Sequence, residues 1–153
     1  MPLFYRIVQE HWAAAALNGE GARLHGGRWN SPGVAAVYLA ESRALAALEI
    51  LVHAPREALH LKWIVIELDV PDSMIDRIPA SKLPEHWRLQ PSSKQAQAFG
   101  SRWLKDYRNL SLLLPSVVIP EEYSLLLNPL NPGMREMKPG NPSPFSFDPR
   151  LAV

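Results

Sequence analysis

Short apolar runs alternate along this chain with polar stretches that are rich in glycine and proline. Apolar runs that contain many β-branched or aromatic side chains are typical of buried strands. We therefore expect strands over residues 4–8, 34–39, 61–70, 110–114 and 116–119. Pro115 separates the last two, because proline cannot donate a hydrogen bond within a sheet.

Three further segments, residues 9–17, 43–53 and 92–108, space their apolar side chains as a helix does. Ser42 is placed to cap the second helix and Pro55 to end it. Either Ser92 or Ser93 can cap the third. The second helix is apolar around nearly its whole circumference, which predicts that it is buried.

The stretches between these elements are expected to be irregular. Residues 19–33 and 71–91 read as loops, and the chain beyond Asn128 reads as a tail interrupted by prolines. No internal repeat or long linker divides the sequence, so residues 1–153 are expected to form a single domain. Because strands outnumber helices and their order is mixed, the predicted fold class is α+β rather than a doubly wound sheet.

Composition narrows the classes of function. The 153 residues carry a formal net charge of +1 and include no cysteine. A near-neutral charge is unlike that of proteins that bind duplex DNA directly, and the lack of cysteine excludes disulfides and thiolate metal sites. The sequence shows neither a signal-peptide pattern nor an apolar run long enough to cross a membrane, so it predicts a soluble, cytoplasmic protein.

The glycine-rich stretch before residues 34–39 is a candidate binding loop. Gly26 and Gly27 allow the backbone to approach a ligand closely. Arg28 follows them with a guanidinium that suits phosphate or carboxylate, and Trp29 and Asn30 lead into the turn before the strand. Two interpretations of this stretch stay open on local sequence: a loop that binds an anion, and an ordinary hairpin turn with a solvated arginine.

A carboxylate in the middle of the apolar helix also needs an explanation, because burying Glu49 without partners is costly. We interpret Glu49 as a catalytic carboxylate that faces a pocket. The alternative is a solvated side chain paired with His53 one turn later.

Two further residues each have two interpretations. Tyr38 is either a core residue or a platform for a ligand. Ser116 is either a site residue or a hydroxyl that satisfies neighbouring backbone groups.

Several common motifs are absent from the sequence. It contains no Gly-x-Ser-x-Gly nucleophile elbow, no phosphate-binding P-loop and no dinucleotide glycine fingerprint. Its five histidines lack the spacing of metal ligands, although His25 adjoins the double glycine. No metal site is predicted.

Together these residues resemble the RES domain family, which is named after an arginine, a glutamate and a serine. Here these would be Arg28, Glu49 and Ser116. The matching blocks follow the family order and span nearly the whole chain: Tyr5-Arg6 and residues 19–23, 26–33, 37–42, 48–53, 114–120, 127–129 and 147–151. The sequence departs from the family at Ser124, near which the family usually has asparagine, and at Asn131, near which it usually has histidine.

The resemblance implies an α+β fold similar to that of ADP-ribosyltransferases, with a central β core flanked by short helices. It implies a bacterial toxin that degrades NAD+ by cleaving the nicotinamide–ribose bond, either by hydrolysis or by phosphorolysis. NAD+ is then a substrate rather than a cofactor, inorganic phosphate is a co-substrate in phosphorolysis, and no metal is needed. Two alternatives stay open: an ADP-ribosyltransferase that modifies a host protein, and an inactive partner-binding module with the same fold.

The resemblance also implies roles for individual residues. Glu49 would stabilise the positive charge that develops on the ribose, and Tyr38 would offer its ring to the cationic nicotinamide. Ser116 would bind a ribose hydroxyl or fix Glu49. The implied catalytic residues are Arg28, Tyr38, Glu49 and Ser116, and the implied substrate-binding residues are Gly26, Gly27, Arg28, Trp29, Asn30 and Tyr38.

The implied partner is an Xre-like antitoxin with a helix-turn-helix DNA-binding region. The toxin itself would reach DNA only through this antitoxin and would not contact a membrane. A homodimer is left open.

Overall fold

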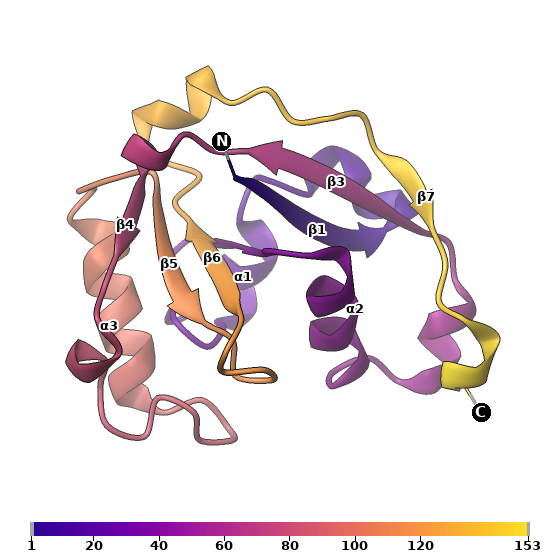
Figure 1. Cartoon of the computed structure of the whole chain (residues 1–153), viewed down its shortest axis with the longest axis horizontal. Coiled ribbons are helices and arrows are strands. Elements are labelled where there is room, and N and C mark those ends of the chain that lie inside the picture. Colours follow the sequence, from indigo (N-terminus) through magenta and orange to yellow (C-terminus); the bar gives the residue numbers. More distant parts are fainter. Residues whose placement is uncertain (1, 153) are drawn as a thin grey trace.

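The computed structural model describes residues 2–152, and a seven-stranded sheet forms its centre (Figure 1). The strand order is β4-β5-β6-β2-β1-β3-β7, in which β4 and β5 pair in parallel and the other pairings are antiparallel. The predicted α+β class is confirmed. The strands are β1 (Leu3–Gln9), β2 (Val37–Ala40), β3 (Trp63–Asp69), β4 (Ile75–Arg77), β5 (Ser111–Pro115), β6 (Tyr123–Leu127) and β7 (Ser143–Phe145).

Helices are few and short. The α-helices are α1 (Glu20–His25), α2 (Arg43–Leu51) and α3 (Lys94–Lys105). The 3-10 helices are η1 (Glu10–Ala15), η2 (Arg56–His60), η3 (Asp72–Met74), η4 (Ala80–Lys82), η5 (Pro132–Glu136) and η6 (Pro149–Ala152). Within residues 2–152 no helix has both the length and the apolar character needed to span a bilayer.

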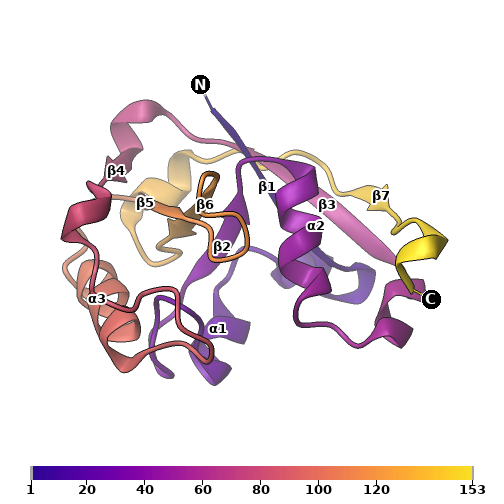
Figure 2. The same ribbon diagram turned by 60° about the horizontal axis from the view of Figure 1, so that its bottom comes forward.

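Helices α2 and α3 lie on the same side of the sheet (Figures 1 and 2). Leu45 and Ala46 of α2 pack against Ile7 of β1 and Val65 of β3. A separate cluster joins Trp103 and Leu104 of α3 to leucines of β5 and β6. The opposite face of the sheet is covered by Leu17, Met134 and Met137. Two separate contacts with one sheet face leave α2 and α3 apart from each other.

The sheet itself opens between β1 and β2. Strand β1 pairs with β3 along its whole length, from Leu3 opposite Asp69 to Gln9 opposite Trp63. Its pairing with β2 is restricted to Tyr5 opposite Ala40. The divergence of these two neighbouring strands, beneath the space between α2 and α3, creates room for a cavity.

The strand predictions are wrong at four places. Residues 116–119 form a bend rather than a strand, because the Ser116 hydroxyl accepts hydrogen bonds from the backbone N–H groups of Val118 and Ile119 and curls the chain. Strand β4 lies in a stretch expected to be a loop, and β7 lies in the tail. Strand β6 was not anticipated, and it completes the sheet by pairing with both β5 and β2.

The predictions for helices are partly correct. Ser42 caps α2 by accepting from the Leu45 N–H at 3.0 Å, and Ser93 caps α3 by accepting from the Ala96 N–H at 3.1 Å. Helix α1 falls in a stretch expected to be a loop, and residues 10–15 form a 3-10 helix where a longer helical stretch was expected.

The predicted burial of the second helix is wrong. Within α2 Leu45 and Ala46 are buried, whereas Leu48 is 37% exposed and Val52, just after the helix, is 57% exposed. One face of α2 packs on the sheet, and the face that carries Leu48 is open to solvent.

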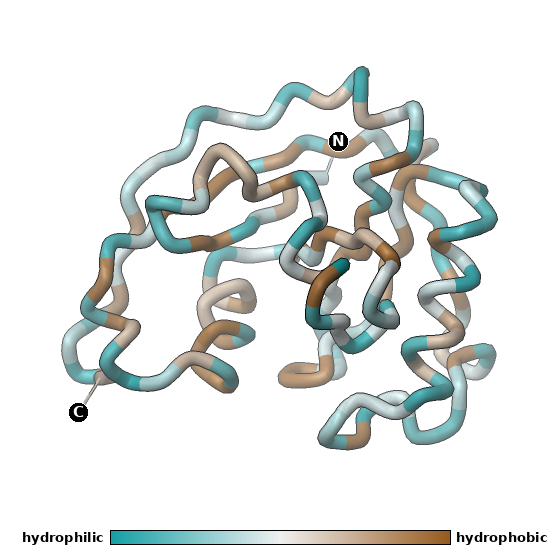
Figure 3. The backbone as a smooth tube through the Cα atoms, turned by 180° about the vertical axis from the view of Figure 1, so that it is seen from behind, coloured by the Kyte–Doolittle hydropathy of each residue, from teal (hydrophilic) through white to brown (hydrophobic). Residues whose placement is uncertain are grey.

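The C-terminal connection from η5 to β7 is coloured hydrophilic along most of its length in Figure 3. It leads to the final residues beside α2, where the Phe147 ring packs edge-on against Trp63 at 5.6 Å. The tail therefore supports the side of the sheet on which α2 sits.

Candidate active site

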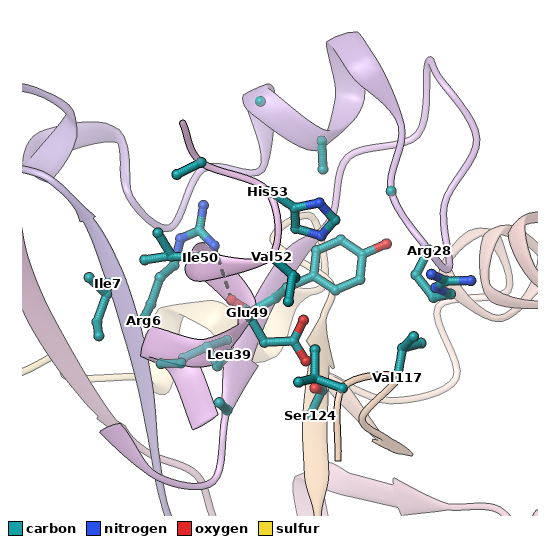
Figure 4. Close-up of a pocket in the computed structure, with 18 of the residues that line it drawn as sticks. Arg6, Ile7, Arg28, Leu39, Glu49, Ile50, Val52, His53, Val117 and Ser124 are labelled. Carbon is teal, nitrogen blue, oxygen red and sulfur yellow. Dashed lines mark hydrogen bonds between the residues drawn. The ribbon is translucent and has the colours of Figure 1, made fainter. Parts of the chain in front are cut away.

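A cavity of about 740 Å³ opens beside the divergence of β1 and β2 (Figure 4). Its volume falls within the range of about 300–1,000 Å³ that is typical of small-molecule sites. Figure 4 shows Glu49 between two guanidinium groups, with Arg6 on one side and Arg28 on the other. Of the residues that the sequence analysis assigned to catalysis or substrate binding, six line this cavity: Gly26, Gly27, Arg28, Trp29, Tyr38 and Glu49.

Asn30 is buried inside the glycine-rich loop and stabilises it through hydrogen bonds. Its side chain is 0% exposed, and its amide donates to the carbonyl oxygens of Ala22 at 2.8 Å and Val34 at 2.9 Å. Its backbone carbonyl accepts from the Gly27 N–H at 2.9 Å. Within the described chain Asn30 is not a lining residue of the cavity. The sequence analysis assigned Asn30 to substrate binding. In the structure its side chain instead forms hydrogen bonds within the loop.

Tyr38 connects this loop to β2. Its hydroxyl donates to Asn30 Oδ1 at 2.6 Å and accepts from the Trp29 N–H at 3.0 Å. Burial raises the pKa of Tyr38 well above its usual range, so the phenol stays neutral and keeps its proton for Asn30. A Cβ atom on Gly27 would lie 2.8 Å from the same hydroxyl, which explains the glycine at that position.

Removal of this hydroxyl should loosen the loop while the aromatic ring stays in the cavity. We expect Tyr38→Phe to lower the free energy of unfolding by about 2 kcal/mol, because a buried N–H and a buried amide oxygen lose their partner. Urea denaturation of the variant beside the wild type measures this difference. Unchanged stability would show that the two hydrogen bonds do not hold the loop.

Glu49 is held in place by Ser116. Its Oε1 accepts from the Ser116 hydroxyl at 2.8 Å. The Ser116 oxygen accepts from the N–H groups of Val118 at 3.0 Å and Ile119 at 3.2 Å. A hydroxyl has a single proton, and both amides direct that proton toward Glu49. Ser116 is 1% exposed and within the described chain does not line the cavity, so of its two implied roles the geometry favours fixing Glu49.

Among the residues that the structure describes, Glu49 forms no ion pair with the cationic side chains of the cavity. Within residues 2–152 no ion pair joins Glu49 to Arg6, Arg28 or His53, although all four side chains line the cavity. The proposed pairing of Glu49 with His53 therefore does not form. A carboxylate and two guanidiniums that face one cavity without touching leave space for a ligand that carries both positive and negative charge.

Arg28 lies at the mouth of the cavity. Its Nη1 donates to the carbonyl oxygens of Trp87, at 3.2 Å, and Leu89. Burial lowers the pKa of Arg28, and the negative charge of Glu49 partly offsets this shift. Arg28 is half-buried and donates to two backbone carbonyl oxygens, so it differs from the freely solvated turn arginine of the alternative.

Arg6 was not singled out as a site residue from the sequence. It projects from β1 into the gap beside β2, where its Nε donates to the Ala16 carbonyl at 2.7 Å and its Nη1 to the Tyr38 carbonyl at 3.0 Å (Figure 4). The Tyr38 carbonyl of β2 thus accepts from the Arg6 side chain at a position where β1 no longer pairs with β2. Burial lowers the pKa of Arg6. The signal in the sequence was a charged residue in an apolar strand, within the matching pair Tyr5-Arg6.

The two positions that depart from the family pattern have different surroundings. Ser124 lines the cavity from β6. Asn131 caps η5, where its Oδ1 accepts from the Gly133 N–H at 2.8 Å, and within the described chain it does not line the cavity. No group of three His, Asp or Glu side chains in residues 2–152 is arranged to hold a metal ion.

Comparisons with known proteins identify a matching family model and similar sequences. The family model described as "RES domain" matches residues 3–148. The "Prs ADP-ribosylating toxin" of Sphingobium sp. (strain YBL2) is 39% identical, with 97% of this chain and 95% of that protein covered. The "Toxin Res" of Yersinia enterocolitica (serotype O:8 / biotype 1B) is 37% identical, with 97% and 99% covered.

A similar fold occurs in a solved structure. A chain of the M. tuberculosis MbcT–MbcA toxin–antitoxin complex superposes with a TM-score of 0.74 at 23% identity, and 98% of this chain and 86% of that chain are covered. At this level of identity the likeness concerns the fold.

Proposed function

Because this chain belongs to the RES domain family, we propose that it is the toxin of a bacterial toxin–antitoxin pair and that it cleaves the nicotinamide–ribose bond of NAD+. The observation that carries the proposal is the placement of Glu49. Ser116 fixes this carboxylate in a cavity that it shares with Arg28 and Tyr38. Relatives named as a Res toxin and an ADP-ribosylating toxin support the same chemistry.

The proposed reaction needs a negative charge beside the ribose. When the bond between the nicotinamide nitrogen and the ribose carbon breaks, its electron pair leaves with nicotinamide, which departs as a neutral molecule. The ribose is left with positive charge, as in glycoside hydrolysis. Glu49 is already oriented by Ser116 and is not paired with a cation, so it can stabilise this charge without prior rearrangement.

The remaining groups suit the other parts of NAD+. Arg6 and Arg28 stand on either side of Glu49 and provide positive charge for the pyrophosphate. The Tyr38 ring faces the cavity and can stack on the cationic nicotinamide. Water or inorganic phosphate then bonds to the ribose carbon, and the product is ADP-ribose or its phosphate ester.

Transfer of ADP-ribose to a protein is the second candidate function. It is favoured by the 39% identical relative, which is named an ADP-ribosylating toxin. The same charge develops on the ribose in this reaction, and only the acceptor differs. The surroundings of Glu49 therefore support both reactions, and analysis of the products separates them.

An antitoxin that covers the cavity is the partner we propose. Val52 lines the cavity and is 57% exposed, and Leu48 and Leu89 are further exposed apolar side chains on α2 and on the segment that Arg28 binds. Exposed apolar groups around a cavity mouth are suited to a protein partner. We assign the antitoxin to the Xre-like helix-turn-helix class, through which the toxin would contact DNA, and we place the pair in the cytoplasm.

The proposal is tested by incubating purified protein with NAD+, with and without inorganic phosphate, and identifying the products. Release of nicotinamide with ADP-ribose indicates hydrolysis, and release that requires phosphate indicates phosphorolysis. In cells, induced expression should deplete NAD+ and arrest growth, whereas Arg28→Ala should do neither. Growth arrest at normal NAD+ levels would instead support protein modification, and absence of arrest would support an inactive binding module.

A further inference from the structure

Residues 84–92, which we call the strap, run across one side of the cavity mouth. Figure 1 shows this segment as part of the loop that projects at the N-terminal end of α3. The strap contains no helix or strand, and most of its residues are exposed. Its residues Gln90 and Ser92 nevertheless line the cavity. An exposed irregular segment therefore supplies part of the wall of the site.

The strap is attached to both sides of the mouth. On one side Arg28 donates to the carbonyl oxygens of Trp87 and Leu89, and the Trp87 ring stacks on Trp29 with 6.1 Å between ring centroids. On the other side Arg88 Nε donates to the Val117 carbonyl at 3.1 Å, and Val117 itself lines the cavity. These contacts join the glycine-rich loop to the bend after Ser116 through the strap.

Arg28 uses one part of its guanidinium for the strap. Both strap carbonyls accept from Nη1, and within residues 2–152 Nε and Nη2 have no acceptor. The Nε and Nη2 groups form the edge with which arginine can bind a phosphate through two parallel hydrogen bonds. The planar guanidinium can therefore bind the strap and an anion at the same time, and a lysine ammonium cannot reproduce this geometry.

We propose that the strap is a substrate-dependent wall of the NAD+ site and that Arg28 couples it to the bound substrate. The strap is held through Nη1, the pyrophosphate of NAD+ binds to Nε and Nη2, and the bound substrate in turn fixes Arg28 and the strap. Gln90 is then a specificity residue whose amide contacts the substrate. This inference rests on the proposed function, because it takes NAD+ as the ligand.

Trypsin cleavage after Arg88 reports directly on the strap, because the peptide bond lies between the two carbonyl groups that Arg28 holds. The Glu49→Gln variant keeps NAD+ bound for longer, because its turnover is expected to be at least about 100-fold slower than that of the wild type. We expect saturating NAD+ to slow this cleavage about tenfold, the factor that corresponds to one additional hydrogen bond to a charged group. Cleavage after Arg135 in the distant η5 serves as the internal control and should not change.

Two variants test the coupling. Without NAD+, Arg28→Lys should be cleaved after Arg88 several-fold faster than the wild type. In the wild-type background Gln90→Ala should raise KM for NAD+ about tenfold with kcat unchanged, the loss expected for one hydrogen bond. Gln95→Ala, an exposed residue of α3, is the matched control for KM.

Failure of the strap inference and failure of the proposed function give different results. If calorimetry shows NAD+ binding to Glu49→Gln and cleavage after Arg88 is not slowed, the strap inference is overturned and the proposed function stands. The same holds if Arg28→Lys is cleaved at the wild-type rate or if Gln90→Ala keeps the wild-type KM. If NAD+ neither binds to Glu49→Gln nor is consumed by the wild type, the proposed function fails, and the inference fails with it.

Discussion

The Glu49→Gln variant is expected to cleave NAD+ at least about 100-fold more slowly than the wild type, because electrostatic stabilisation of a developing charge contributes a factor of this order or more. The amide has nearly the same shape as the carboxylate, and its oxygen can still accept the Ser116 hydrogen bond. The free energy of unfolding should therefore stay close to that of the wild type. Release of nicotinamide measured over time, together with urea denaturation, tests both parts.

Two further variants place this result in context. Glu57→Gln removes a carboxylate from the exposed side of η2 and should leave the rate unchanged, since Glu57 does not line the cavity within the described chain. Ser116→Ala keeps Glu49 but removes the hydroxyl that orients it, so we expect an intermediate loss of about tenfold. A folded Glu49→Gln protein with near wild-type turnover would rule out the role assigned to Glu49.

Gly100→Ala is expected to have the second large effect, although Gly100 does not line the cavity within residues 2–152. A Cβ atom at this position in α3 would lie 1.9 Å from the Trp29 carbonyl oxygen. Such overlap forces the helix and the glycine-rich loop apart, and overpacking of this kind costs about 1–3 kcal/mol or more. Because Arg28 precedes Trp29, the displacement should also lower the rate of NAD+ cleavage more than tenfold.

The sign of the change in stability makes this test sharp. Replacing glycine by alanine in a helix ordinarily stabilises it by about 1 kcal/mol, so a loss of stability identifies the contact with Trp29 as the cause. Gly140→Ala is the matched control, because its Cβ would meet the Glu67 carbonyl at an ordinary 3.5 Å. We expect it to change neither stability nor activity. A stable and active Gly100→Ala protein would contradict the packing of α3 on the loop.

Local signals in the sequence were sufficient for several elements. The run Trp63–Asp69 is β-branched and apolar enough to form a strand in most surroundings. Ser42 and Ser93 cap their helices through bonds to residues three positions later, so the interaction is complete within one turn. The resemblance to the RES family directed attention to Arg28, Tyr38, Glu49 and Ser116. The first three line one cavity, and Ser116 donates a hydrogen bond to Glu49.

Other features depend on segments that are distant in sequence. Strand β4 has three residues and is a strand because β5 lies beside it. The apolar circumference of α2 indicated burial, yet only one face of α2 meets the sheet. Asn30 was expected to bind substrate because it follows Arg28 and Trp29 in the glycine-rich loop. Its hydrogen bonds inside the loop become evident only when Ala22, Val34 and Tyr38 surround it.

The sequence by itself determined the fold class and the cap of α2, and it narrowed the cap of α3 to Ser92 or Ser93, because these follow from local propensity and from chemistry carried by single side chains. The tertiary structure decided which groups meet. It placed Arg6 in the gap between β1 and β2, turned the single proton of Ser116 toward Glu49, and brought the strap to Arg28 across about sixty residues of sequence. These contacts are long-range hydrogen bonds, and their partners are selected by the packing of the sheet and helices, which no local pattern encodes.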